Sequence, residues 1–246
     1  KDQIIKICDR DYIGCDQLIL IKKNRTIDAG LEFYNSDGSV SGACGNGTRC
    51  VADLLAKENN KKEIILWTSG GVLKSKILGH NLVETEIGVS KTNWNEIPLS
   101  ENLNTKNLNI KILDKNNNEY IGGTAVNVGN PHVIFFVNSI VDYNLEKIGP
   151  EIENDKIFPE KCNVTLAQVI NNNLIKVRVW ERGAGLTKAC GTAACATVVA
   201  GNINELVEKK VDIEFALGRL SILIDENNSI HMKGPVSDIK NIEIKL

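Results

Sequence analysis

The same short phrase occurs twice in the chain, each time where a helix is expected to begin. Its core is Ala-Cys-Gly followed by Asn or Thr, and its cysteines are Cys44 and Cys190, 146 residues apart. Solenoid repeats recur every ~20–50 residues, so this spacing excludes them. It fits two domains that descend from one ancestral unit. The duplication therefore predicts two related domains, each with a cysteine at a helix N-terminus.

Only two segments have the pattern of longer helices, and each follows one of these cysteines. The first covers about 47–57 and ends at an Asn-Asn pair. The second covers about 192–200 and ends at Gly-Asn, a common C-cap. Because the second segment is apolar on nearly every side, we expect it to be buried all round.

Short runs of β-branched and aromatic residues, bounded by Gly, Asn or Asp, predict that strands make up most of the remaining structure. The predicted strands are 4–7, 18–21, 31–34, 64–67, 72–78, 109–113, 125–128, 133–137, 174–180, 211–215 and 221–224.

The domain boundary is expected in the polar, Asn-rich stretch 90–107, which contains Pro98. We assign 1–97 to the N-terminal domain and 98–233 to the C-terminal domain. The tail 234–246 has the pattern of strands and is expected to return to the first domain.

Composition narrows the choice of partner. The 29 Lys and Arg residues nearly balance the 31 Asp and Glu residues, and the two signs are mixed along the chain. This distribution disfavours nucleic acid and anionic membranes as partners. No run reaches the ~18–20 apolar residues of a membrane span, and no signal segment opens the chain. We expect a cytoplasmic protein with a small-molecule ligand.

Cysteine at a helix N-terminus is suited to acid–base chemistry. Unpaired backbone N–H groups and the helix dipole lower the pKa of the thiol, and flanking glycines let the same amides approach a carboxylate. Two such thiols, facing each other across a cleft, could act on opposite faces of one substrate carbon. One would remove a proton as thiolate and the other would deliver a proton as thiol, which inverts the stereocentre.

Packing, metal binding and redox chemistry could also account for cysteines in this pattern. Small residues around an isolated cysteine at the start of a helix most often reflect tight packing. Here the whole motif at the helix start is duplicated, which favours a catalytic role. A zinc site is disfavoured because Cys44 to Cys50 and Cys190 to Cys195 have the wrong spacing. No Cys-x-x-Cys redox motif occurs, and an odd total of seven cysteines argues against a disulfide framework.

Six ordered blocks resemble the diaminopimelate epimerases, amino-acid epimerases that work without pyridoxal phosphate. In the related proline racemases and hydroxyproline epimerases the first motif usually reads Cys-Gly-His, so Asn46 favours diaminopimelate. The blocks are 14–17 (Gly-Cys-Asp-Gln), 35–39 (Asn-Ser-Asp-Gly-Ser), 43–50 (Ala-Cys-Gly-Asn-Gly-Thr-Arg-Cys), 129–132 (Gly-Asn-Pro-His), 181–185 (Glu-Arg-Gly-Ala-Gly) and 189–192 (Ala-Cys-Gly-Thr).

The resemblance implies an α+β fold of two pseudo-symmetric domains, each an antiparallel, barrel-like sheet around a central helix, with the active site in the cleft between them. It implies an isomerase that interconverts LL- and meso-diaminopimelate in lysine and peptidoglycan-precursor synthesis. It implies that neither a cofactor nor a metal is needed, and that the protein forms a homodimer.

Site residues follow from the same resemblance. Cys44 and Cys190 would be the catalytic acid/base pair, with His132 supporting Cys44 and Glu181 supporting Cys190. The substrate carboxylate would lie on the amides of residues 45–46 and 191–192. Domain closure would bring both thiols to the substrate. The residues expected to bind substrate are Gln17, Asn35, Gly45, Asn46, Asn130, Asn163, Glu181, Arg182, Gly191 and Thr192.

The five other cysteines are expected to be packing residues, with Cys50 and Cys195 buried inside the helices. Two departures from the family pattern bear on activity. Leu186 replaces a usual Glu beside the second motif, and no Gly-Asn-Asp-Phe loop precedes Gly14. From the second departure we expect about two dozen N-terminal family residues to be missing. The alternatives left open are an epimerase for another amino acid and a binding module without turnover.

Overall fold

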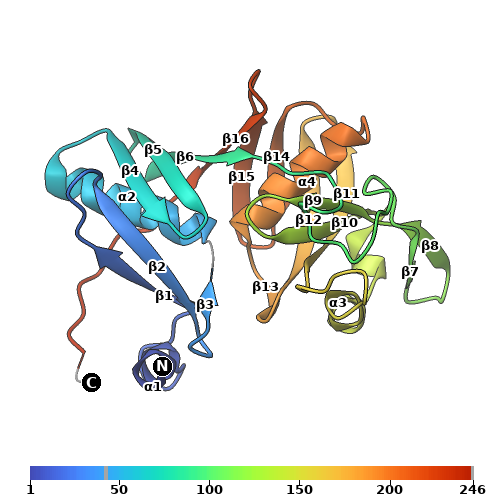
Figure 1. Ribbon diagram of the computed structural model, residues 1–246, viewed down its shortest axis with the longest axis horizontal. Coiled ribbons are helices and arrows are strands. Elements are labelled where there is room, and N and C mark those ends of the chain that lie inside the picture. Colours follow the sequence, from blue (N-terminus) through green and yellow to red (C-terminus); the bar gives the residue numbers. More distant parts are fainter. Residues whose placement is uncertain (42–43, 245–246) are drawn as a thin grey trace. The chain divides into compact units, whose positions relative to one another are not determined.

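The computed structural model describes residues 1–41 and 44–244 (Figure 1). The chain divides into two compact units: unit 1 comprises Lys1–Glu86 and the chain from Lys233 onward, and unit 2 comprises Ile87–Met232. It passes between the units within strands β6 (Leu82–Val89) and β16 (Ser229–Pro235). Gly42 and Ala43 of the first cysteine motif lie outside the described residues.

Unit 1 is a mostly antiparallel sheet packed on one long helix. Its strands follow the order β1-β2-β4-β5-β6-β16, with β3 also paired to β2, and β2 and β4 form a parallel pair. One face of helix α2, including Ala52 and Leu55, packs against Phe33 and Leu66 of the sheet. The elements are α1 (Asp2–Cys8), β1 (Gln17–Lys22), β2 (Ala29–Asn35), β3 (Val40–Ser41), α2 (Gly45–Asn59), β4 (Glu63–Thr68) and β5 (Gly71–Gly79).

Unit 2 surrounds a helix that is buried over most of its length. Its strands follow the order β16-β15-β14-β12-β11-β10-β9, with β13 on β12, and the β10–β11 and β12–β14 pairs are parallel. Residues 191–201 of helix α4 are all buried against these strands, as its sequence predicts. The elements are β7 (Ile110–Leu113), β8 (Glu119–Gly122), β9 (Thr124–Asn127), β10 (Pro131–Phe136), the 3-10 helix η1 (Ile140–Asp142), α3 (Leu145–Glu153), β11 (Asn163–Asn171), β12 (Leu174–Glu181), β13 (Gly185–Thr187), α4 (Gly191–Ile203), β14 (Lys210–Phe215) and β15 (Gly218–Ile224).

The duplication seen in the sequence recurs in the topology of the two units. In unit 1, β1 pairs with β2, a hairpin leads to β3, and α2 crosses to β4, which is parallel to β2. In unit 2, β11, β12, β13, α4 and β14 repeat the same succession. Gln17 opens β1 and Asn163 opens β11, at the same spacing as the two cysteines. Each helix thus follows a hairpin and a cysteine.

The stretch 90–107, where the domain boundary was expected, lies inside unit 2. Ile97 is fully buried and Leu99 is 5% exposed, and both pack in a second core of this unit with Phe135 and Leu145. The division between the units falls earlier, between Glu86 and Ile87. It does so because the apolar side chains of Ile97 and Leu99 anchor the otherwise polar stretch 90–107 in unit 2.

Several local predictions were wrong. Residues 4–7, predicted as a strand, lie in helix α1, where the least exposed positions are Ile4, Ile7 and Cys8. That is helical spacing, which a short apolar run does not distinguish from a strand. Beyond Pro235 the described part of the tail contains no strand; it joins unit 1 through Val236, whose N–H donates to the carbonyl of Asn81 at 2.9 Å.

Helix α3 was not predicted, because Gly149-Pro150 looks like a helix end. Leu145, Ile148 and Ile152 nevertheless form one buried stripe, and Asn144 caps the helix by accepting the N–H of Lys147. Strands β3, β6, β8, β11, β13 and β16 were also missed. Within residues 1–41 and 44–244, no helix combines the length and the apolar character that crossing a membrane requires.

Candidate active site

The first cysteine motif places Cys44 at the N-terminus of α2. Cys44 is the N-cap residue, and its Sγ accepts the backbone N–H of Gly47 at 3.2 Å. The side chain is half-buried. A sulfur in this position faces the positive end of the helix, which stabilises a thiolate more than a thiol.

Glycine at position 47 is what allows this approach. A Cβ added there would lie 3.0 Å from Cys44 Sγ and 2.4 Å from the Cδ1 atom of Ile19. Any larger residue would therefore displace the sulfur or the tip of Ile19. The Gly in this motif is explained by its close contacts with Ile19 and with the thiol.

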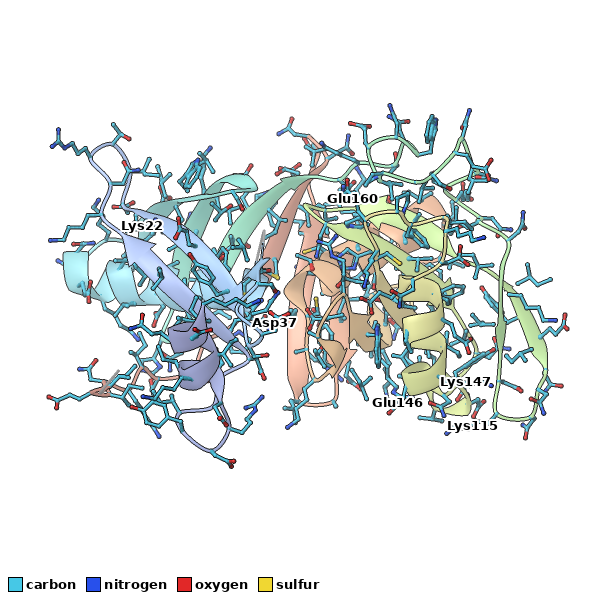
Figure 2. The ribbon with its side chains drawn as sticks, turned by 60° about the horizontal axis from the view of Figure 1, so that its bottom comes forward. Lys22, Asp37, Lys115, Glu146, Lys147 and Glu160 are labelled. Carbon is cyan, nitrogen blue, oxygen red and sulfur yellow. The ribbon has the colours of Figure 1, made fainter. Side chains whose placement is uncertain are left out.

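Two other predicted substrate residues meet on neighbouring strands of unit 1. Gln17 opens β1 opposite Asn35, the last residue of β2, and its Nε2 donates to Asn35 Oδ1 at 3.1 Å. Asn35 Nδ2 in turn donates to Ser39 Oγ at 3.0 Å. Asp37, labelled in Figure 2, accepts the N–H of Ser39 and orders this turn. Both amides are thus held in defined orientations.

Asn46 lies in the first turn of α2 and has a partner within the helix. Its Oδ1 accepts a hydrogen bond from Arg49 Nη2 at 2.9 Å. This bond uses the amide oxygen, so the amide nitrogen of Asn46 remains the group that can donate to a ligand. Cys50, one helical turn after Asn46, is exposed, so its predicted burial was wrong: it lies on the outer side of α2 rather than on its packed face.

The second cysteine motif places Cys190 at the N-terminus of α4, in far more buried surroundings. Cys190 is 5% exposed, and its Sγ lies 3.4 Å from the hydroxyl of Thr192. Burial and the neighbouring carboxylate of Glu181 raise the pKa of this thiol well above its ordinary value, although the Thr192 hydroxyl and the Ala193 N–H oppose the shift. The helix terminus alone would lower the pKa, so desolvation outweighs it here.

Glu181 reaches Cys190 from the end of β12. It precedes the hairpin to β13, and its Oε1 accepts the hydroxyl hydrogen of Thr187 across that hairpin. The turn passes through Gly183, whose φ of +74° lies in the left-handed region that glycine tolerates best. The hairpin therefore fixes a carboxylate beside the second thiol.

Sequence reasoning missed the residue that anchors this hairpin from helix α3. Glu153, at the end of α3, is 6% exposed. Its Oε2 accepts the indole N–H of Trp180 at 2.7 Å, and its Oε1 accepts the backbone N–H of Gly183 at 3.0 Å. The two bonds bracket Glu181. Since α3 itself was not predicted, nothing in the sequence marked this carboxylate.

His132 lies on β10 and is fully buried. Its Nε2 is 2.9 Å from Asn130 Oδ1 and 3.4 Å from Asn163 Nδ2. Because an amide oxygen only accepts, the shorter contact favours the ring proton on Nε2. Nδ1 is then a lone pair, with no hydrogen-bond partner among the described residues. Burial and the positive charge of Arg182 lower the pKa of His132 to about 3, so the ring is neutral at ordinary pH.

Asn163 joins His132 to the loop that carries Arg182. It lies opposite His132 in the parallel β10–β11 pair, and its Nδ2 donates to the carbonyl of Pro131 at 2.9 Å. Its Oδ1 accepts the backbone N–H of Arg182 at 3.0 Å. The Arg182 guanidinium is held by the backbone carbonyl of Glu160 at 2.8 Å; Glu160 is labelled in Figure 2.

Unit 2 therefore gathers most of the predicted site. Its members are Asn130, His132, Asn163, Glu181, Arg182, Cys190, Gly191 and Thr192, whereas Gln17, Asn35, Cys44, Gly45 and Asn46 belong to unit 1. Within residues 1–41 and 44–244, no three His, Cys, Asp or Glu side chains are grouped to hold a metal ion. The chemistry offered is that of thiols, one carboxylate, one neutral imidazole and the backbone amides of two helix starts.

Comparison with solved structures defines the fold. A phenazine biosynthesis protein of the PhzF family from Bacillus anthracis superposes with a TM-score of 0.67 at 14% identity, covering 100% of this chain and 89% of that chain. A hydroxyproline epimerase from Agrobacterium vitis, solved with bound trans-4-hydroxy-L-proline, gives a TM-score of 0.68 at 14% identity, covering 95% and 76%. These likenesses confirm the predicted fold class.

Sequence comparison identifies the family. The family model described as diaminopimelate epimerase matches residues 1–92 and 124–239. A diaminopimelate epimerase of Acidiphilium cryptum (strain JF-5) is 40% identical over 233 residues, covering 94% of this chain and 82% of the relative. One of Pelagibacter ubique (strain HTCC1062) is 75% identical over 246 residues, covering 100% of this chain and 90% of the relative. This chain belongs to the diaminopimelate epimerase family.

Proposed function

We propose that this protein is an isomerase that interconverts LL- and meso-diaminopimelate without a cofactor or metal. The observation that carries the proposal is its 75% identity, over all 246 residues, to a diaminopimelate epimerase. The reaction supplies lysine and peptidoglycan-precursor synthesis. We place the protein in the cytoplasm as a homodimer.

Two thiols exchange protons with one substrate α-carbon in this mechanism. Cys44, whose sulfur accepts the Gly47 N–H, starts as thiolate and removes the α-proton. Cys190, which burial and Glu181 favour in the thiol form, donates its proton to the opposite face of the carbon. Cys44 ends as thiol and Cys190 as thiolate, and exchange with solvent resets the pair. The reverse reaction runs with the roles exchanged.

The carbanion has no cofactor to delocalise its charge, so hydrogen-bond donors must stabilise it. The amides at the starts of α2 and α4, residues 45–46 and 191–192, are such donors, and they would hold the substrate carboxylate on which negative charge develops. Since both helix starts are fixed by their own hydrogen bonds, these donors need little reorganisation during the reaction.

Two supporting groups assist the thiols. The neutral His132 ring has an Nδ1 lone pair that can accept a thiol hydrogen, and we assign it to Cys44. Glu181 accepts the proton of Cys190 when that thiol is regenerated as thiolate. The amides of Gln17, Asn35, Asn130 and Asn163 and the cation of Arg182 supply partners for the ammonium and carboxylate groups at the two ends of diaminopimelate.

The substrate assignment is tested by turnover under reducing conditions. Incubation with LL-diaminopimelate should yield meso-diaminopimelate, resolved by chiral chromatography, whereas L-proline and trans-4-hydroxy-L-proline should remain unchanged. Racemisation of proline with unchanged diaminopimelate would contradict the assignment. Binding of diaminopimelate without any interconversion would instead favour a binding module.

A further inference from the structure

A second pair of cysteines lies in unit 1, apart from the proposed acid–base thiols. Cys8 ends α1 and Cys15 precedes β1, and their Sγ atoms are 3.4 Å apart. Both sulfurs are reduced. Two sulfur atoms in van der Waals contact need only a small side-chain movement to reach the ~2.05 Å of a disulfide bond.

The turn between α1 and β1 builds this proximity. The N–H of Tyr12 donates to the carbonyl of Asp9 at 3.0 Å, and Gly14 has a φ of +73°. A Cβ on Gly14 would lie 3.2 Å from the Cα of Arg10, so glycine is needed for the turn to close this tightly. An ion pair between Arg10 and Asp16 lies across the same turn. The two thiols are therefore held together by local backbone geometry.

The two thiols differ in access. Cys8 is 4% exposed, whereas Cys15 is half-buried. Burial and the hydrogen-bond contact between the Cys8 thiol and Cys15 raise the pKa of Cys8 to about 11. Both cysteines line a cavity of about 250 Å³, together with Ile5, Asp9, Arg10 and Ser36. An oxidant that enters this cavity meets Cys15 as its first nucleophile.

We propose that Cys8 and Cys15 are an attacking and resolving thiol pair that a low-molecular-weight disulfide converts reversibly into an intramolecular disulfide. The Cys15 thiolate attacks one sulfur of the oxidant, breaks its S–S bond and releases one thiol. Cys8 then attacks Cys15 in the mixed disulfide and releases the second thiol. The two protein protons leave on the released thiols, and two electrons pass from the protein to the oxidant.

The modification has a local structural consequence. It ties the C-terminal end of α1 to the residue two positions before Gln17, whose amide bonds Asn35. The disulfide would therefore fix the start of β1, and it would do so without consuming Cys44 or Cys190. The reaction is independent of the proposed epimerase activity.

Oxidised glutathione is the probe, and the full chain with Cys44→Ser and Cys190→Ser removes interference from the proposed acid–base thiols. After alkylation of free thiols, non-reducing peptide mapping should find Cys8 joined to Cys15, and dithiothreitol should reverse it. The exposed Cys50 is an internal control, because a thiol with no neighbouring cysteine should retain glutathione as a mixed disulfide.

Single replacements in the same background test the order of attack. In Cys8→Ser, Cys15 should accumulate a mixed disulfide with glutathione; in Cys15→Ser, Cys8 should be modified at least about tenfold more slowly. A Cys15 that keeps glutathione while an unaltered Cys8 stays free would overturn the proposal. So would equal reactivity of the two single variants, or reaction at Cys50 with neither Cys8 nor Cys15 modified.

Discussion

The helix N-termini at Cys44 and Cys190 have the same backbone conformation but differ in what surrounds the sulfur. Cys44 and Cys190 are both extended N-cap residues, with φ/ψ of −145°/97° and −138°/118°. Each cysteine follows a short hairpin, β2–β3 or β12–β13. The helix after it leads to a strand, β4 or β14, that is parallel to the first strand of that hairpin. The duplicated unit therefore presents both sulfurs to a helix N-terminus in the same way.

Their surroundings differ in burial and in neighbouring charge. Cys44 is half-buried on a helix with one packed face, and it accepts the Gly47 N–H. Cys190 is nearly inaccessible at the start of a helix buried on all sides, with the Glu181 carboxylate beside it. A symmetric backbone can thus hold one thiol in a setting that favours thiolate and another in a setting that favours the protonated form. That asymmetry suits a pair in which one member accepts and the other donates.

The largest effect should come from removing either sulfur. Cys44→Ala and Cys190→Ala should each lower the rate of diaminopimelate interconversion by at least about 10³-fold, because neither thiol can replace the other on the opposite face. Cys50→Ala, on the exposed side of α2, is the matched control and should keep near-normal turnover. If one entrance proved dispensable, the two-thiol mechanism would be wrong.

The next effect concerns the carboxylate that distinguishes the second entrance. Glu181→Gln should reduce kcat by about 10²-fold in the reverse direction, in which Cys190 must act as thiolate, since Cys190 loses its proton acceptor. It should also lower the pKa of Cys190, because the negative charge that disfavours the thiolate is gone. The limb of the pH–rate profile that reports this thiol should move to lower pH.

Glu160→Gln is the control for that experiment. Glu160 contacts Arg182 through its backbone carbonyl, so its side chain can change without altering that bond. An unchanged pH profile in Glu181→Gln would show that the carboxylate does not control Cys190.

A smaller effect is expected where α3 holds the hairpin. Glu153→Gln keeps one acceptor oxygen but turns an N–H₂ group toward either Trp180 or Gly183, so one buried donor loses its partner. The free energy of unfolding in urea should fall by about 1–3 kcal/mol, and kcat should fall with it. Glu151→Gln, exposed on the same helix, should change neither quantity. A Glu153→Gln protein that is as stable and as active as the unmodified protein would show that Glu153 does not position the hairpin.

The smallest effect should come from crowding the first entrance. Gly47→Ala places a Cβ 3.0 Å from Cys44 Sγ. The sulfur must then move by a few tenths of an ångström, so turnover should slow by about tenfold. Gly79→Ala, where a Cβ meets nothing within 4 Å, is the matched control. Equal activity of the two variants would mean that the Gly47 contact does not position the sulfur.

The parts of the structure that depend on hydrophobic periodicity and on the repeated motif could be predicted from the sequence. Helices α2 and α4 and most of the strands could be predicted, because their apolar residues recur with the period of the element. Helix α1 and helix α3 could not. In α1 the apolar run is too short to reveal its period, and in α3 a Pro inside the helix hides the buried stripe.

The candidate site divides along the same line. Local motifs nominated Cys44 and Cys190 as candidates, and they also nominated His132, Asn163 and Arg182, which lie together in the structure. They did not reveal Glu153, whose two hydrogen bonds join segments about thirty residues apart in the chain. Nor could they give the raised pKa of Cys190, because the helix start that lowers it is visible in the sequence and the burial that raises it is not.

The measurement that tests the central claim most directly follows deuterium at early times. LL-diaminopimelate is incubated with the enzyme in D₂O under reducing conditions, and mass spectrometry is applied separately to the product and to the remaining substrate. Two thiols on opposite faces predict one deuterium in each meso product molecule, delivered by the second thiol, while the remaining LL substrate stays unlabelled. Equal labelling of both isomers from the first time points, or a product that keeps the original hydrogen, would contradict the two-thiol mechanism.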